Sequence, residues 1–405
     1  FSGATFGDMA TIEIDGGETW SDCPTEVVGD KLMVSIPIDK LWPANRNITV
    51  TAKFNSVLNG TRYYFATDPL EFATESATTI ILGSGTSDNP YLVYTANQLA
   101  KMTSKLNSCY SLVRNVDFSG VSSWQPVGSD EDHAFSGEFN GNGFTISNLN
   151  INKESSNNVG FFGCNAGYVY DLNVDGSITG NQCVGAIAGM NFGTIENCIS
   201  TADVTGNEAV GGIAGYSNIE SSYLLNNGQV SGGDQVGGLA GYKQNTFRSS
   251  KNTALVRGTG STGGLVGKSC GIIINSLNNA NVVSTTGACG GIIGSEYTLE
   301  TDPSEIYNCY SVGNVNGATG KTSTIAGVYV DSYTMYSVFT TASSRINGVA
   351  VPASNNPPST SFIGELTVVG NPDTSYCFAA NTFRINMTWE TEWNSTVWAS
   401  LNTGR

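Results

Sequence analysis

The sequence of 405 residues is poor in the groups that most enzymes and nucleic-acid-binding proteins use. It has one histidine, and only 13% of its residues are charged, with 18 Lys and Arg against 34 Asp and Glu. A single histidine excludes a zinc site built on several histidines and confines any Ser-His-Asp triad to His133. The net charge of −16 repels polyanions, which excludes nucleic acid as a partner.

Long apolar runs and paired cysteines are also missing. No apolar run is long enough for a transmembrane helix. The chain starts at Phe1 with no Met and no signal sequence, so either an export signal has been removed or the sequence starts inside a longer one. In the first case a lipid anchor would lie in that missing leader. The nine cysteines contain no C-x-x-C pair, and their spacing selects no disulfide.

One short phrase, G-x-[LIF]-x-G, recurs between Val159 and Gly327, with Val159 and Ser323 in place of the first glycine in the first and last copies. Its seven copies are spaced by 26, 26, 26, 26, 27 and 33 residues, and self-similarity at a fixed period indicates a repeat architecture. The central apolar residues are Phe161, Ile187, Ile213, Leu239, Leu265, Ile292 and Ile325. The closing glycines, which we interpret as structural, are Gly163, Gly189, Gly215, Gly241, Gly267, Gly294 and Gly327.

Two further sets of residues repeat with the same period as this phrase, and we call each set a ladder. β-Branched residues and glycine turns fill each repeat, and helical periodicity is missing, so we expect each repeat to form one coil, or rung, of a parallel β-solenoid. Stacked rungs bury like side chains on one another, and stacked asparagines hydrogen-bond along the axis. The apolar ladder is Ile178, Val204, Val230, Val256, Val282 and Val315, and the asparagine ladder is Asn226, Asn252 and Asn278.

The phrase, followed in one repeat by Asn191-x-Gly193-Thr194-Ile195-x-Asn197, resembles the GLUG motif of bacterial surface proteins. The segments Pro90–Leu99, Trp124–Gly128 and Phe135–Ile146 are similar to the blocks that precede that motif. The resemblance covers about residues 89–350 and implies a β-solenoid in an adhesin-like or secreted protein. Two repeats depart from the pattern, one at Ser323 and Thr324 and one that lacks the Asn-x-Gly-Thr-Ile continuation.

These patterns predict an all-β protein with four parts. Residues 1–75 have short strand patterns and an Asn59-Gly60 hairpin signal, which favour a small Ig-like or fimbrillin-like β-sandwich. Residues 76–89 are a Ser/Thr/Gly-rich linker. Residues 90–350 are a right-handed parallel β-helix of about seven rungs, whose N-terminal end is capped by a helix that starts at the Thr95-x-x-Gln98 capping box. Residues 351–405 are a C-terminal capping segment.

Acidic residues are the first candidates for chemistry. Enzymes on β-helices need carboxylates that converge from neighbouring rungs, but only Glu208 and Asp234 share a repeat position. His133 stands in an Asp130-Glu131-Asp132-His133 run, which we interpret as a solvated loop. The longest repeat contains four acids that could hold calcium or form a solvated acidic loop: Glu296, Glu300, Asp302 and Glu305. We expect no other cofactor and no catalytic residue.

Aromatic residues are the second candidates, because their flat apolar faces suit sugar rings. Tyr216 and Tyr242 are one repeat apart, and Trp389 and Trp393 lie in the C-terminal segment. Both sets are candidates for ligand binding, and packing is the alternative for each. We therefore expect a non-enzymatic bacterial protein of the cell surface or extracellular space, with outer-membrane anchoring, that binds a host protein, matrix protein or glycan. A carbohydrate-active enzyme, a glycan-binding module and a structural spacer are the alternatives.

Overall fold

The computed structural model describes residues 83–296 and 304–328 without a break, and shorter segments on both sides of them. On the N-terminal side these segments are 5–6, 9–14, 18–28, 31–34, 47–58 and 61–73, and on the C-terminal side 334–336, 339–340, 344–350 and 362–363. Among the described residues, no helix has the length and hydropathy needed to cross a bilayer. Glu300, Asp302, Trp389 and Trp393 lie outside the described residues, as does the C-terminal segment apart from 362–363.

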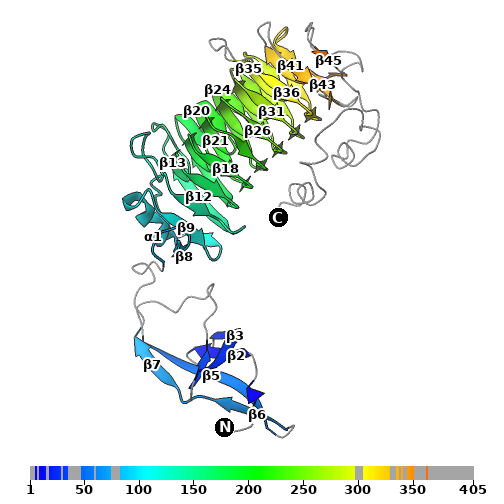
Figure 1. Cartoon of the computed structure of the whole chain (residues 1–405). Helices are drawn as coiled ribbons and strands as arrows, with labels where there is room; N and C mark the ends of the chain where they lie inside the picture. The colour runs from blue at the N-terminus through cyan, green and yellow to red at the C-terminus, as the bar shows by residue number, and fades with distance from the viewer. Residues whose placement is uncertain are drawn as a thin grey trace.

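The N-terminal region is antiparallel. Its seven strands are linked as one sheet through the long strands β3 and β5 (Figure 1). Leu58 pairs with Thr61, so β5 and β6 form the expected hairpin, while Asn59 and Gly60 lie outside the described residues. A small core contains Ile12, Ile14 and Trp20. The strands are β1 (Thr5–Phe6), β2 (Met9–Ile14), β3 (Glu18–Val28), β4 (Lys31–Val34), β5 (Asn47–Leu58), β6 (Thr61–Ala66) and β7 (Leu70–Ala73).

The solenoid begins with the expected capped helix. Thr95 Oγ1 accepts a hydrogen bond from the Gln98 backbone N–H, and Gln98 Oε1 accepts one from the Thr95 N–H, which completes the capping box. The α-helix α1 (Ala96–Leu99) is short and continues as the 3-10 helix η1 (Ala100–Ser104). Leu99 and Met102 are fully buried in the solenoid core.

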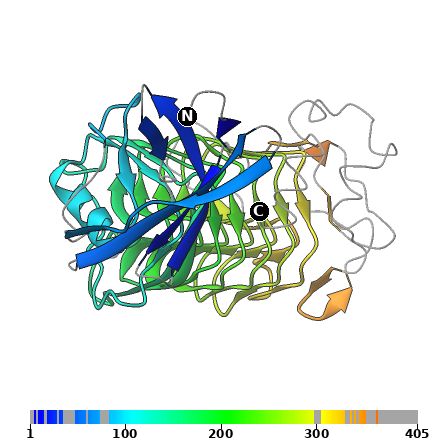
Figure 2. The ribbon, with the colours of Figure 1, turned by 90° about the horizontal axis from the view of Figure 1, so that it is seen from below.

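Three parallel sheets form the walls of the solenoid, and the seven rungs that carry the phrase contribute to all three (Figures 1 and 2). The first solenoid sheet has 20 strands, and only its last pair, β43 with β44, is antiparallel. Its strands are β10 (Val116–Asp117), β12 (Thr145–Asn152), β15 (Asn173–Thr179), β16 (Gln182–Gly185), β19 (Ile199–Ser200), β20 (Asp203–Gly211), β23 (Leu225–Asn226), β24 (Val230–Gly237), β27 (Lys251–Asn252), β28 (Val256–Gly258), β29 (Thr262–Gly263), β32 (Leu277–Asn278), β33 (Val282–Ser284), β34 (Cys289–Gly290), β37 (Tyr310–Ser311), β38 (Val315–Asn316), β39 (Thr322–Ser323), β42 (Phe339–Thr340), β43 (Arg345–Ile346) and β44 (Val349–Ala350).

The second and third solenoid sheets have 11 and seven strands. The second contains β8 (Tyr91–Val93), β9 (Cys109–Leu112), β11 (Glu138–Asn140), β14 (Tyr168–Tyr170), β18 (Thr194–Glu196), β22 (Ser221–Ser222), β26 (Phe247–Arg248), β31 (Ile272–Ile274), β36 (Glu305–Tyr307), β41 (Thr334–Tyr336) and β45 (Phe362–Ile363). The third contains β13 (Phe162–Asn165), β17 (Ala188–Asn191), β21 (Ala214–Ser217), β25 (Ala240–Lys243), β30 (Val266–Ser269), β35 (Ile293–Glu296) and β40 (Ala326–Val328).

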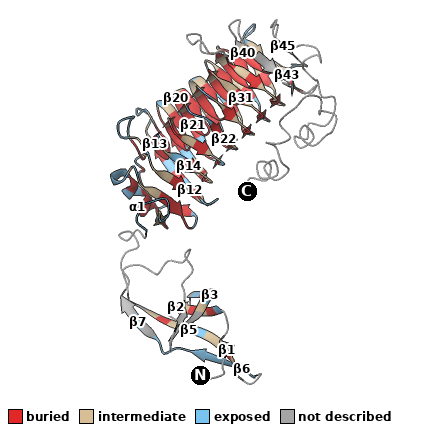
Figure 3. Cartoon of the chain, in the orientation of Figure 1, coloured by how far each residue is buried: buried red, intermediate tan, exposed pale blue. Residues whose placement is uncertain are grey.

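The apolar ladders occupy the interior, as the sequence predicts. Val204 pairs with Val230 and Val230 with Val256, each one repeat further along the chain. The central residues of the seven phrases and the six residues of the apolar ladder are at most 1% exposed, and the strands of the rungs form a continuous buried band (Figure 3). Because every rung places an apolar side chain on an apolar neighbour, the rungs bury together a core that no single rung could bury alone.

The closing glycine of the phrase is needed for close packing rather than for an unusual backbone angle. A Cβ added at Gly241 would lie 2.2 Å from the carbonyl carbon of Ala209, and one at Gly215 would lie 2.3 Å from that of Cys183. Neither glycine has a positive φ. Left-handed backbone occurs instead at another corner, where six residues at equivalent positions have φ between 49° and 55°: Asp171, Asn197, Tyr223, Ser249, Asn275 and Asn308.

Polar side chains also stack inside the solenoid. Asn226 donates a hydrogen bond to Asn252 and Asn252 donates one to Asn278, so the asparagine ladder is confirmed. A second column follows the ends of the third solenoid sheet, where register pairing joins Asn165, Asn191, Ser217, Lys243, Ser269 and Glu296. Lys243 is fully buried, and its Nζ donates to three backbone carbonyl oxygens, those of Asn245, Cys270 and Ile272.

Candidate functional site

Tyr216 and Tyr242 form an aromatic column on the outside of the third solenoid sheet. They pair in register on β21 and β25, and their ring centroids are 5.3 Å apart. Phe192 extends the column by one rung, with its ring centroid 5.6 Å from that of Tyr216. In these strands alternate side chains point to opposite faces, so the residues that follow the two tyrosines, Ser217 and Lys243, point inward. We call Phe192, Tyr216 and Tyr242 the aromatic column.

One glutamine connects the two tyrosines. The Tyr216 hydroxyl donates a 2.7 Å hydrogen bond to Gln244 Oε1, and Gln244 Nε2 donates a 2.8 Å bond to the Tyr242 hydroxyl. Burial, together with the nearby Tyr242 and the charge of Glu131, raises the pKa of Tyr216 to about 12. The tyrosine is therefore neutral at physiological pH. Because Gln244 holds both tyrosine hydroxyls, the rings of the aromatic column are already oriented for a flat apolar ligand.

The loop that contains His133 is solvated, in agreement with its sequence interpretation. His133 Nδ1 and Asp130 Oδ1 are 2.7 Å apart, and both side chains are more than half exposed. The hydrogen bond with Asp130 raises the pKa of His133 above its ordinary value. No serine or cysteine hydrogen-bonds to His133 within the described residues, so a hydrolytic triad has no nucleophile in place here.

Of the candidate calcium ligands, the structure describes Glu296 and Glu305, which lie on strands of different sheets. Glu296 ends β35 and is buried, and its Oε1 accepts a hydrogen bond from the Ser304 backbone N–H. Glu305 begins β36, in a different sheet, and its Oε2 accepts one from the Tyr307 hydroxyl. Across the described part of the chain, no three His, Cys, Asp or Glu residues come together as metal ligands. Glu296 thus lies in the interior and not in a solvated loop.

Glu208 and Asp234 stack in register, as their spacing predicts. Glu208 accepts hydrogen bonds from the side-chain amides of Gln182 and Gln235, at 2.9 and 3.2 Å. Asp234 Oδ1 accepts one of 2.6 Å from the Ser261 backbone N–H. These bonds connect each carboxylate to a neighbouring rung, so the two acids stabilise the stacking.

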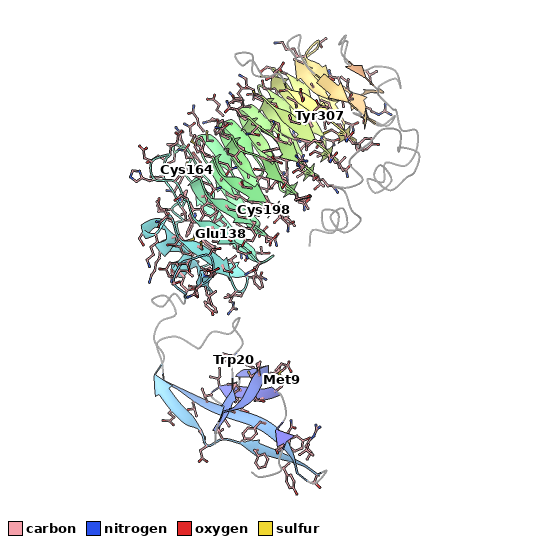
Figure 4. The ribbon with its side chains drawn as sticks, in the orientation of Figure 1. Met9, Trp20, Glu138, Cys164, Cys198 and Tyr307 are labelled. Carbon is pink, nitrogen blue, oxygen red and sulfur yellow. The ribbon has the colours of Figure 1, made fainter. Side chains whose placement is uncertain are left out.

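Sequence reasoning missed a group of four residues on the outer face of the second solenoid sheet, which we call the tyrosine–glutamate cluster: Glu138, Tyr168, Tyr170 and Glu196. Tyr168 and Tyr170 alternate with the buried Val169 on β14, and their rings stack with centroids 4.6 Å apart. The Tyr168 hydroxyl donates to Glu196 Oε2, and the Tyr170 hydroxyl donates a 2.7 Å bond to Glu138 Oε1. Figure 4 labels Glu138 and also Tyr307, which lies further along the same sheet.

A signal for this cluster exists in the sequence. Tyr168-Val169-Tyr170 is a polar-apolar-polar triplet, and Glu196 follows Tyr170 by the length of one regular rung. Glu138, however, precedes Tyr168 by more than that length, and the two pair in register all the same. The first rungs are longer than the regular ones. Their register therefore cannot be predicted by counting 26 residues back from the repeated phrase.

Comparisons with known proteins give partial matches. No known family model matches the chain. The chain is 34% identical over 168 residues, 38% of its length, to halomucin of Haloquadratum walsbyi. It is 36% identical over 128 residues, 28% of its length, to a protein of Evansella cellulosilytica named as a candidate Gly-rich membrane protein. The chain spans only 2% and 15% of the lengths of these curated relatives.

Among solved structures, the chain is similar to a candidate immunoglobulin A1 protease from Bacteroides ovatus. The superposition covers 71% of this chain and 85% of that chain. Its TM-score is 0.49, with 23% sequence identity.

Proposed function

We propose that this chain is a non-enzymatic protein of the cell surface or extracellular space whose solenoid binds a glycan along the aromatic column. The observation that carries the proposal is the pair of adjacent, mutually tilted rings of Tyr216 and Tyr242, whose hydroxyls Gln244 holds on the outer face of the sheet. Sugar rings present C–H faces that pack on aromatic rings, and their hydroxyls hydrogen-bond to side-chain amides. The aromatic column supplies the rings, and Gln244 beside it supplies the side-chain amide.

The surface location has separate support. One relative bears the name of a Gly-rich membrane protein and another is halomucin, and the repeated phrase resembles the GLUG motif of bacterial surface proteins. A solenoid suits such a location because stacked rungs build an extended, rigid surface along which a ligand chain can lie. Outer-membrane anchoring, and a host or matrix molecule as the carrier of the glycan, belong to the same proposal.

A non-enzymatic role fits the acids of the rungs. Glu208, Asp234, Glu138 and Glu196 all accept hydrogen bonds from neighbouring rungs or tyrosines. Hydrolysis of a glycosidic bond needs one carboxylic acid whose pKa is raised and a second carboxylate across the bond from it. The regular bonding of these four acids between rungs favours a non-catalytic role for their carboxylates.

The experiment is a glycan-array screen of the purified chain, followed by titration calorimetry with the glycans that bind. Replacing Tyr242 with Ala removes ring surface, and we expect the affinity to fall by about tenfold. Tyr242→Phe keeps the ring and should lose less than about threefold. Tyr64→Ala, on the N-terminal sheet, where Tyr64 is 79% exposed, is the matched control and should bind like the wild type.

Two results would count against the proposal. If no glycan binds, the aromatic column is not a glycan site, and the alternative of a structural spacer is favoured over a glycan-binding module. If a glycan binds equally well to the wild type and to Tyr242→Ala, the aromatic column is not the site.

A further inference from the structure

The tyrosine–glutamate cluster differs from the aromatic column in its chemistry, because it carries negative charge. Tyr168 pairs in register with Glu138 on the preceding rung, and Tyr170 pairs with Glu196 on the following one. The hydroxyl bonds run diagonally, from Tyr168 to Glu196 and from Tyr170 to Glu138. The two carboxylates therefore flank the stacked rings at the level of the phenol oxygens.

Neither carboxylate has a cationic partner in the described part of the chain. The ion pairs there join Lys53 to Glu13, His133 to Asp130 and Arg248 to Glu220. Glu138 accepts from the hydroxyls of Tyr170 and Ser87, and Glu196 accepts from that of Tyr168. Hydroxyl donors leave the negative charge in place. The cluster thus holds two charges without a counterion on a chain whose net charge is already −16.

The rings supply the second element of recognition. Tyr168 is 37% exposed, so part of its ring is open to a ligand. Burial and the hydrogen bond to Glu196 raise the pKa of Tyr168 above its ordinary value, which keeps the phenol neutral and donating. A neutral tyrosine ring attracts a cation to its face, and a carboxylate beside the ring adds a direct charge interaction.

The kind of cation follows from the number and shape of the ligands. Calcium takes six to eight oxygen ligands, and no group of three acidic, His or Cys side chains is gathered among the described residues. A guanidinium group fits better, because it is planar, stacks on an aromatic face and pairs with carboxylates through several N–H donors. We propose that the tyrosine–glutamate cluster binds an arginine side chain of a basic polypeptide segment. This site is independent of the glycan site on the third solenoid sheet.

The test is fluorescence anisotropy with a labelled hexa-arginine peptide and the full chain. The geometry predicts saturable binding that weakens as salt is added, because exposed charges are screened. Glu196→Gln and Glu138→Gln keep side-chain size and remove one charge each, and each should weaken binding by about fivefold to tenfold. Tyr168→Ala should do the same, and a hexa-lysine peptide should bind several-fold more weakly than hexa-arginine because it cannot stack in the same way.

Glu208→Gln is the matched control, since it removes the same charge from a residue in another sheet. Binding within about twofold of the wild type is expected for it. An equal loss for Glu208→Gln and Glu196→Gln would overturn the proposal, because net charge alone would explain the binding. Unchanged binding in the Glu196→Gln and Glu138→Gln variants, with wild-type thermal unfolding, would overturn it as well. So would a neutral glycan that needs Tyr168 but neither glutamate, which would make the cluster a second sugar site.

Discussion

Asn226 Nδ2 donates a 2.9 Å hydrogen bond to Asn252 Oδ1, directly across one rung of the solenoid. Both side chains are fully buried, and Asn252 continues the ladder by donating to Asn278 and to the backbone oxygen of Ala254. A buried amide is stable only when its donors and acceptors are satisfied. The ladder satisfies the middle residue, Asn252, through the rungs on both sides, so it connects the rungs from within.

Replacing Asn252 with Leu should therefore destabilise the solenoid strongly. The change leaves a buried donor of Asn226 and a buried acceptor of Asn278 without that partner, at a cost of about 3 kcal/mol in the free energy of unfolding. Urea unfolding measures the difference. Asn207→Ala is the control, since Asn207 donates a similar bond to Asn181 on the exposed surface, and it should cost less than about 0.5 kcal/mol. Equal losses in the free energy of unfolding for the two variants would mean that the buried asparagine ladder stabilises the solenoid no more than an exposed asparagine pair does.

Substitution of the closing glycine of the phrase should destabilise the solenoid for steric reasons. A methyl group at Gly241 would lie 2.2 Å from backbone atoms of Ala209 and Val210, which cannot move without displacing a rung. Gly241→Ala should lower the free energy of unfolding by about 3 kcal/mol or more. Gly120 has nothing within 4 Å of the same added atom, so Gly120→Ala should change stability by less than about 0.5 kcal/mol. Thermal and urea unfolding of the two variants would show whether close approach is the reason for the glycine.

The buried Lys243 side chain should make the stability of the solenoid depend on pH. Burial lowers the pKa of this lysine from 10.5 to about 7. Between these values the unfolded chain binds a proton at Lys243 that the folded chain does not bind. The contribution of Lys243 to stability is therefore highest above the unfolded pKa and is lost as the pH falls toward about 7, by up to about 1.4 kcal/mol per pH unit.

The measurement compares the wild type with Lys243→Met, a neutral side chain of similar length. The stability of the wild type relative to the variant should rise between pH values of about 7 and 10. A flat difference across that range would show that the folded protein keeps Lys243 protonated through its three carbonyl partners.

The regular part of the fold could be predicted because a repeat displays its own periodicity. The spacing of Val204, Val230 and Val256 gave the register of the rungs, and the Asn226 ladder and the Thr95 capping box followed from local chemistry. In each case the residue type and its position indicate the same environment. Where equivalent positions of neighbouring repeats carry the same residue type, their stacking can be predicted without knowledge of the rest of the fold.

The buried lysine and the tyrosine–glutamate cluster could not be predicted in that way. At the position of Lys243 the neighbouring rungs carry Ser217 and Ser269, and only the folded corner shows that three carbonyl oxygens surround the side-chain nitrogen. Glu138 and Tyr168 pair although their separation along the chain exceeds one regular rung. Their contact depends on the length of an irregular rung, and the spacing of the repeated phrase does not predict that length.

The 26-residue length of the regular rungs decides which side chains face inward. The most direct test of this relationship is the thermal unfolding of two deletion variants, followed by circular dichroism. Removing residues 205–230 takes out one whole rung and joins Val204 to Ser231, which pairs in register with Thr205 in the wild type. Removing residues 205–229 takes out one residue fewer and shifts every following side chain of the strand to the opposite face. We predict that the first variant melts cooperatively within about 5 °C of the wild type and that the second melts at least about 10 °C lower. Equal melting of the two variants would contradict the account.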